Sequence, residues 1–108
     1  MLTTNETSRP EEDYRAYVDF EYIEQNYNVD DSEKITLGAA AWEYACIKYA
    51  ETHTMPDDGR VCFWWEDNYV WLADSNGACI PGKEEENNHM ARLFENEYGK
   101  LLKANVRL

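Results

Sequence analysis

The side chains that could bind a metal ion are three cysteines and two histidines, and their spacing argues against a metal site. These residues are Cys46, Cys62, Cys79, His53 and His89. No two of them are as close in sequence as the ligand pairs of zinc knuckles and ribbons. The acids do not follow the pattern of a calcium-binding loop either. The sequence therefore predicts no metal and no cofactor.

The same residues lack the surroundings of a catalytic nucleophile, which needs a base and a group that orients the base. Cys46 lies in an apolar helical stripe and is typical of a core residue. His53 is typical of a residue that caps a helix end, and His89 of a solvated surface residue. No phosphate-binding loop or hydrolase motif occurs, and 22 acids make any one carboxylate pair uninformative. We therefore expect that the protein is not an enzyme.

The strongest chemical signal is charge: 22 Asp and Glu stand against 10 Lys and Arg, a net charge of −12 in 108 residues. Such a surface repels nucleic acid and anionic lipid and attracts basic proteins. The basic residues are scattered, which argues against direct nucleic-acid binding. Residues 1–34 are the most acidic part, with ten acids against three bases. The alternative is that the charge only keeps the protein in solution.

Carboxylates of the first predicted helix are expected in exposed rows, one or two turns apart. Glu12, Asp19 and Glu24 form one row, and Glu11, Arg15 and Asp19 form another. Such rows can imitate the phosphates of a duplex for a site built of Lys and Arg. A solvated helix face is the commoner explanation of the same pattern.

This first helix is predicted from capping signals. After a frayed start over residues 1–8, Ser8 is a typical cap and Pro10 a typical first-turn residue, and the helix is expected to end at about Asn26. Part of the segment also alternates between apolar and polar residues, as a strand does. The acid content and the length favour the helix.

Two further helices follow from apolar spacing. The first is capped by Ser32 and ends near residues 52–54, and the small residues 38–41 within it predict the close approach of a neighbouring element. The second is an amphipathic helix that starts at residues 84–86 and carries an apolar stripe.

Between these two helices the sequence predicts a three-stranded antiparallel meander. Asp67 and Asn68 form the first two-residue turn, while Asn76 and Gly77 are typical of a type I′ turn. The second hairpin is expected to set Ala73 opposite Ile80. The three strands are expected over residues 61–65, 69–73 and 78–80.

The first hairpin sets Trp64 opposite Trp71 and Glu66 opposite Tyr69, and both faces of the sheet are then apolar. The second face needs a cover, since antiparallel sheets usually leave one face polar. Its cover is either the chain's own helices, a second copy or a partner. In the last case Trp64, Tyr69 and Trp71, bounded by Glu66 and Asp67, form an exposed binding patch.

These elements predict an α+β fold: two N-terminal helices, a three-stranded antiparallel β-meander and a C-terminal amphipathic helix in one domain, residues 1–108. No apolar run is long enough to cross a membrane, and residues 1–8 are polar. An odd number of well-separated cysteines fits reduced thiols. We therefore expect a cytoplasmic protein that does not bind membranes.

The expected function is that of a small acidic inhibitor or adaptor that docks on a basic, nucleic-acid-handling protein. Phage counter-defence proteins, nucleic-acid mimics, and immunity proteins or antitoxins have this size and charge. The alternative is a structural module that self-associates, for instance as a homodimer, and whose acidity only gives solubility. The residues expected to bind a partner are Glu11, Glu12, Asp19, Glu24, Trp64, Glu66, Asp67, Tyr69 and Trp71.

Overall fold

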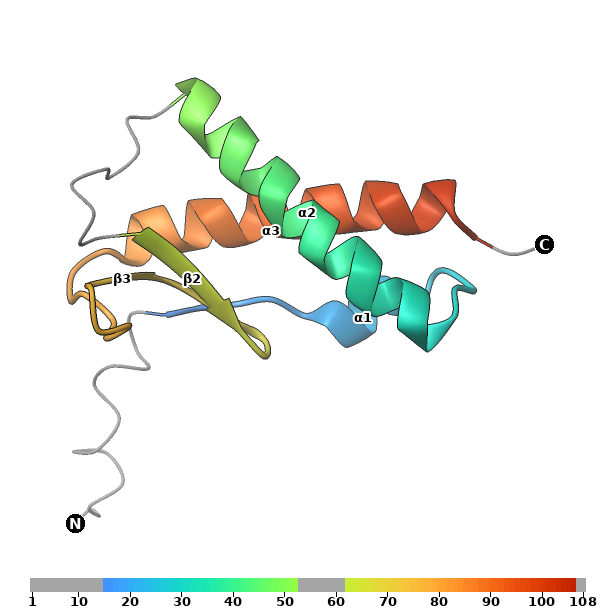
Figure 1. Cartoon of the computed structure of the whole chain (residues 1–108), viewed down its shortest axis with the longest axis horizontal. Helices are drawn as coiled ribbons and strands as arrows, with labels where there is room; N and C mark the ends of the chain where they lie inside the picture. The colour runs from blue at the N-terminus through green and yellow to red at the C-terminus, as the bar shows by residue number, and fades with distance from the viewer. Residues whose placement is uncertain (1–14, 53–61, 107–108) are drawn as a thin grey trace, which may run out of the picture.

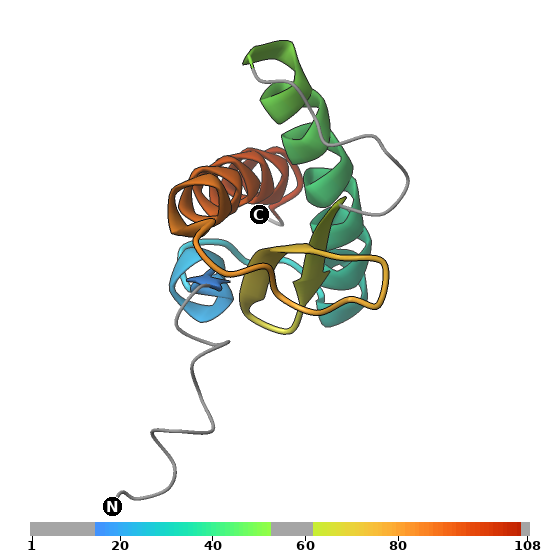
Figure 2. The ribbon, with the colours of Figure 1, turned by 90° about the vertical axis from the view of Figure 1, so that its left-hand side faces the viewer.

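The computed structural model describes residues 15–52 and 62–106, and its fold is α+β. Its elements are β1 (Ala16–Tyr17), α1 (Phe20–Glu24), α2 (Asp31–Thr52), β2 (Cys62–Glu66), β3 (Tyr69–Ala73) and α3 (Glu84–Ala104). The two long helices α2 and α3 form one layer, and the sheet and the short α1 form the other (Figures 1 and 2). The sheet is antiparallel with the order β1-β3-β2, so β3 is its central strand.

β2 and β3 form the predicted first hairpin in the predicted register. Trp64 pairs with Trp71, and Glu66 pairs with Tyr69. Asp67, the first of the two turn residues, has a φ of 54°. A positive φ at this position is a feature of two-residue hairpin turns, because it matches the twist of the strands. This hairpin is confirmed.

The predicted first helix is wrong over residues 15–19, which are extended. β1 pairs antiparallel with β3, and the Val18 N–H then donates to the carbonyl of Asn68 at 2.7 Å. Ala16 and Val18 are buried while Tyr17 between them is exposed, which is the burial pattern of a strand. Pairing with β3 both satisfies the backbone and buries two side chains, so it outweighs the helical signal. The predicted start of that helix lies outside the described residues.

The short α1 begins after Asp19, whose Oδ1 accepts a hydrogen bond from the Tyr22 N–H at 3.1 Å. Two contacts tie this corner to α3. The Asp19 N–H donates to Glu95 Oε2 at 3.4 Å, and Arg92 Nη2 donates to the Tyr17 carbonyl at 2.6 Å. The helix therefore starts where the edge strand ends, and α3 holds both.

Residues 78–80, the predicted third strand, form a single bridge instead, between Ala73 and Cys79. The bridge is one residue away from the predicted pairing. The cause is Asp74, whose carboxylate accepts two backbone N–H groups of the turn at 2.9 and 3.0 Å. Of the two predicted turn residues only Gly77 has a positive φ, 87°, so the turn is not type I′. β1 lies along the same edge of β3 but at its other end, opposite Tyr69 and Val70.

The long helices form where they are predicted and pack on each other. α2 begins at Asp31, one residue before the predicted cap. Gly38 is buried, and a Cβ there would lie 3.5 Å from the ring of Trp65, so the predicted close approach is confirmed. α3 buries one stripe of its surface in the core. The stripe comprises Met90, Phe94, Tyr98 and Leu102.

The second face of the sheet is partly covered by the loop after β3 and by Arg15. Trp71 is only 6% exposed, and its Nε1 donates to the Gly77 carbonyl at 3.0 Å. The backbone of Gly77 also lies against Trp64, since a Cβ on this glycine would come within 2.8 Å of the indole. The Arg15 guanidinium lies 4.3 Å from the centre of the Tyr69 ring. This cover is a loop and an arginine, whereas the sequence predicted helices, a second copy or a partner.

Candidate functional site

An open groove of about 400 Å³ lies where α1, the first half of α2 and the β2–β3 turn meet. We call it the aromatic groove. It combines aromatic rings with two carboxylates and one lysine, and a concave surface with a few polar groups is the usual form of a binding site. Its lining residues are Phe20, Glu24, Lys34, Ile35, Gly38, Trp65, Asp67, Asn68 and Tyr98.

The aromatic lining belongs to a cluster of rings in the core. The Phe20 ring lies 6.0 Å from the ring of Trp65 and 5.4 Å from that of Tyr98, centre to centre. Phe94 is fully buried and packs edge-on against both Phe20 and Trp65, at 5.3 and 4.6 Å. These contacts fix the orientation of the rings. Phe20 and Trp65 are only partly buried, so their rings form part of the groove surface. The contacts with Phe94 make this aromatic surface rigid.

Glu24 is a carboxylate held in place at this groove. The Tyr98 hydroxyl donates to Glu24 Oε2 at 2.6 Å, and Lys34 Nζ lies 3.9 Å from Oε1. Burial and the hydrogen bond to Glu24 raise the pKa of Tyr98 well above its ordinary value, so the phenol keeps its proton and remains a donor. A carboxylate has about four acceptor positions, so Glu24 can accept further hydrogen bonds.

The β2–β3 turn forms the rim of the groove and is fixed beside α1. Trp65 Nε1 donates to the backbone carbonyl of Asp67 at 2.9 Å. The Asn68 side-chain amide donates to the carbonyl of Val18 at 2.9 Å. The turn is therefore tied both to the groove and to the residue that precedes the α1 cap. Asp67 itself is exposed.

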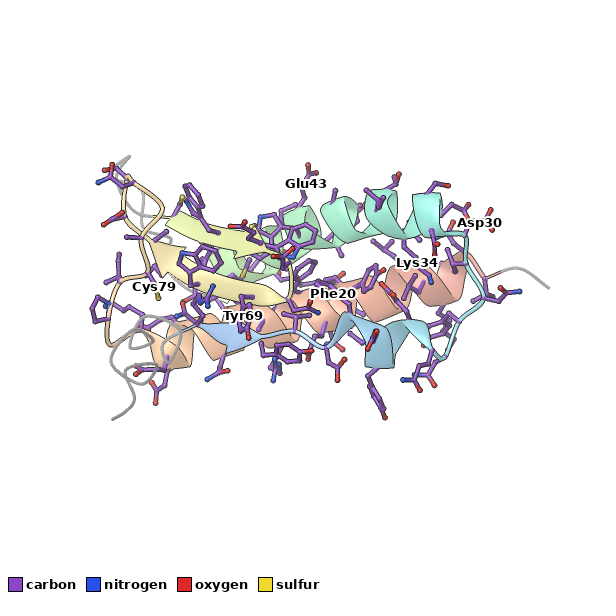
Figure 3. All side chains as sticks on the ribbon, turned by 90° about the horizontal axis from the view of Figure 1, so that it is seen from below. Phe20, Asp30, Lys34, Glu43, Tyr69 and Cys79 are labelled. Carbon is purple, nitrogen blue, oxygen red and sulfur yellow. The ribbon has the colours of Figure 1, made fainter. Side chains whose placement is uncertain are left out.

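The segments that line the aromatic groove are rich in acids. Residues 19–34 contain six acids and one lysine, and Glu66 and Asp67 add two more acids at the hairpin turn beside α1. Lys34 and Asp30 lie at the end of the molecule opposite Cys79 (Figure 3). The six acids are Asp19, Glu21, Glu24, Asp30, Asp31 and Glu33. The fold therefore places one hairpin acid, Asp67, in the same groove as Glu24 of the acidic segment.

The predicted site residues are partly brought together. Glu24 and Asp67 line the same groove although 42 residues separate them. Asp19 and Glu66 are exposed, at the cap of α1 and at the last residue of β2. Neither of the two predicted helical rows continues through Asp19, because this residue caps α1 and residues 16–18 before it are extended.

The predicted tryptophan patch lies on the other face of the sheet. The rings of Trp64 and Trp71 are 6.5 Å apart, but Trp71 is buried under the loop and only Trp64, 40% exposed, is an accessible anchor. Tyr69 is partly buried. The remaining two predicted residues, Glu11 and Glu12, lie outside the described residues.

The cysteines are three free thiols. Burial raises the pKa of Cys46, and the nearby Cys62 adds to this effect, which disfavours the reactive thiolate. Cys62 Sγ accepts a hydrogen bond from Trp64 Nε1 at 3.1 Å. His89 is exposed and His53 lies outside the described residues. In the part of the chain that the structure describes, no three side chains of the metal-binding types form a group.

Sequence reasoning missed the aromatic lining of the groove. The spacing of Phe20, Trp65 and Tyr98 indicates only apolar faces of a helix, a sheet and the last helix, and no groove. The only local signal was the run of small residues at 38–41, which marks where another element approaches. The groove forms from the packing of distant elements.

No model of a known protein family, no curated protein and no solved structure matches this chain. Within the described residues, neither α2 nor α3 combines the length and the apolar character that crossing a bilayer requires. The chemistry of the site itself is therefore what indicates a function.

Proposed function

We propose that this protein is a small acidic inhibitor or adaptor that docks on a basic surface of a nucleic-acid-handling protein. Small acidic proteins of this general type include phage counter-defence proteins, nucleic-acid mimics, and immunity proteins or antitoxins that neutralise nucleases. The observation that supports the proposal is the set of eight carboxylates on residues 19–34 and the hairpin turn, against one lysine in the same segments.

The charge acts mainly on encounter and orientation. An anionic end attracts a cationic surface over a distance, and the attraction weakens with ionic strength. Affinity needs anchors that are removed from water, and aromatic side chains supply most of them in known interfaces. Tyr22 is 65% exposed and Tyr17 is 52% exposed, so both offer aromatic anchors near the acids.

The test is capture of the partner by the purified protein from an extract of the source cell. We expect a basic nucleic-acid-binding protein to be retained at low ionic strength and released by salt, and duplex DNA or RNA to compete for it. Replacing three acids outside the groove, Glu21→Gln, Asp30→Asn and Asp31→Asn, should abolish retention.

The matched control neutralises three exposed acids elsewhere, Glu43→Gln, Glu51→Gln and Glu84→Gln. This variant has the same net charge as the test variant and should still retain the partner. Equal retention by both variants, or retention that salt and nucleic acid leave unchanged, contradicts the proposal.

The second candidate function is self-association, and two exposed side chains of α2 favour it. Tyr44 and Ile47 are 48% and 56% exposed and lie one turn apart on the side of α2 opposite the buried Ala45. A second copy packing there would cover them. The mass of the protein in solution distinguishes the candidates: a salt-resistant dimer that Ile47→Glu dissociates supports self-association.

We further propose that the protein acts in the cytoplasm, is not an enzyme and does not bind nucleic acid directly. The three free thiols support a reducing compartment. The net charge of −12 argues against direct contact with phosphates.

A further inference from the structure

We propose that the aromatic groove receives one arginine side chain of the basic partner, with the guanidinium stacked on Phe20 and Trp65 and paired with Glu24. This inference rests on the proposed function and specifies how the partner is recognised. The groove holds an aromatic surface, an oriented carboxylate and a second carboxylate at the rim, Asp67.

The size of the groove suits a single side chain. A volume of about 400 Å³ is at the lower end for ligand sites, which range from roughly 300 to 1,000 Å³. Its open shape admits a side chain from a protein surface, and Gly38 in its lining presents no side chain to narrow it. Ile35, 76% exposed, lines the groove and offers apolar surface to the methylene groups of the incoming residue.

The Glu24 carboxylate is already oriented, and its negative charge is only weakly neutralised by Lys34. Tyr98 holds its Oε2, whereas the pair with Lys34 is long, at 3.9 Å. Lys34 has a second partner, because its Nζ lies 3.4 Å from Asp31 Oδ1. An incoming cation can therefore displace the lysine from Glu24 while the lysine keeps an ion pair.

The geometry favours arginine over lysine. A guanidinium is planar, so it stacks on aromatic rings and forms two parallel hydrogen bonds with a carboxylate. It is also less strongly hydrated than an ammonium group, and so loses less on entering a partly apolar groove. The acids around the groove add the complementary charge.

The experiment is a titration with three capped tripeptides, Gly-Arg-Gly, Gly-Lys-Gly and Gly-citrulline-Gly, followed by NMR. The signals observed are the Trp65 indole N–H and the backbone amides of Gly38 and Asp67, with the Trp71 indole on the other sheet face as the internal reference. The arginine peptide should shift the groove signals and bind more tightly than the lysine peptide. The neutral citrulline peptide should not bind.

Two pairs of variants test the named contacts. Glu24→Gln preserves shape and an acceptor for Tyr98, and should weaken binding of the arginine peptide by about tenfold, the effect of losing one charge-assisted contact. Glu43→Gln on the outer side of α2 makes the same charge change and should have no such effect. Lys34→Gln removes the competing cation and should tighten binding several-fold, whereas Lys48→Gln should not.

A groove that binds the three peptides equally, or in which Glu24→Gln and Lys34→Gln leave arginine binding unchanged, overturns the inference. Thermal unfolding of each variant checks that the fold is retained, and the gain in affinity expected for Lys34→Gln cannot arise from a loss of folding.

The groove proposal and the proposed function can be rejected independently of each other. Partner capture that responds to the acids outside the groove but not to Glu24→Gln rejects the groove alone. Arginine binding without any basic partner rejects the proposed function.

Discussion

The contact between Tyr98 and Glu24 joins the core to the surface within one pair of side chains. Tyr98 is 2% exposed and its ring packs in the aromatic cluster, while its hydroxyl donates a hydrogen bond to Glu24, which lines the groove. Stability and site geometry therefore depend on the same phenol. A hydrogen bond to a charged acceptor contributes more than a neutral one.

We predict that Tyr98→Phe lowers the free energy of unfolding at neutral pH by about 1–2 kcal/mol, because one charge-assisted hydrogen bond is lost. The pH dependence follows from the raised pKa of Tyr98. Below pH 10, the ordinary tyrosine value, the phenol is protonated in both states and its contribution is complete. As the pH rises above 10 the unfolded chain loses this proton first, so the wild type loses stability.

Denaturant unfolding at a series of pH values measures this effect. The difference in stability between wild type and Tyr98→Phe should shrink above pH 10. Tyr44→Phe, at an exposed ring, is the control and should match the wild type. A constant difference across this range would contradict the assignment.

The central strand β3 depends on a side chain of α3 to complete its hydrogen bonds. β1 pairs only with Tyr69 and Val70, and beyond its end the Leu72 N–H donates to Asn87 Oδ1 at 2.8 Å. Asn87 is fully buried. The Asn87 side chain thus supplies the acceptor that a longer β1 strand would otherwise offer to β3.

We predict that Asn87→Ala lowers the free energy of unfolding by about 1–3 kcal/mol, since the buried Leu72 N–H loses this acceptor. Chemical denaturation measures the loss, and hydrogen exchange at Leu72 should become faster. Asn88→Ala, at the exposed neighbouring position, is the matched control and should change neither quantity. Slow exchange at Leu72 in the Asn87 variant would show that another group satisfies the amide.

Elements whose pairing is local were predictable, and those that depend on distant partners were not. The β2–β3 register follows from two turn residues between apolar runs, so Trp64 opposite Trp71 could be derived from the sequence. β1 is a strand because β3 lies beside it, about fifty residues further along the chain. Residues 78–80 were mispredicted because the Asp74 side chain, rather than the following asparagine and glycine, shapes the turn.

The residues of the candidate site also fall into predictable and unpredictable ones. Glu24 and Asp67 could be selected from charge alone, whereas Phe20 and Trp65 have no sequence signal that separates a groove wall from a core residue. Trp71 was selected as an anchor because tryptophan in a charged setting is typical of interfaces. The loop that buries it could not be foreseen, since it depends on the hydrogen bond from Trp71 to the Gly77 carbonyl.

At the scale of the whole molecule, charge opposes the compact state. With a net charge of −12 the acids repel one another on average, and the described ion pairs of Lys34, Arg92 and Lys100 neutralise only a few of them. Folding places Asp67 of the hairpin in the same groove as Glu24 of the acidic segment, which adds to the repulsion there.

We predict that sodium chloride stabilises the protein against heat. Raising the salt from ~0.01 M to ~1 M shortens the screening length from about 30 to about 3 Å and removes most of the repulsion. The midpoint of thermal unfolding should therefore rise. The gain should be smaller in the variant with Glu21→Gln, Asp30→Asn and Asp31→Asn. A midpoint that falls with salt would mean that attractive ion pairs dominate the surface.

The attachment of β1 to later parts of the chain sets an order of events during synthesis. β1 is synthesised before its partners, which are β3 and then Arg92 of α3, 75 residues further along the chain. Until residue 87 has emerged, the edge of β3 that β1 and Asn87 complete is unfinished. The native sheet is therefore completed only after much of α3 has been synthesised, so the pairing of β1 is a late, long-range step of folding.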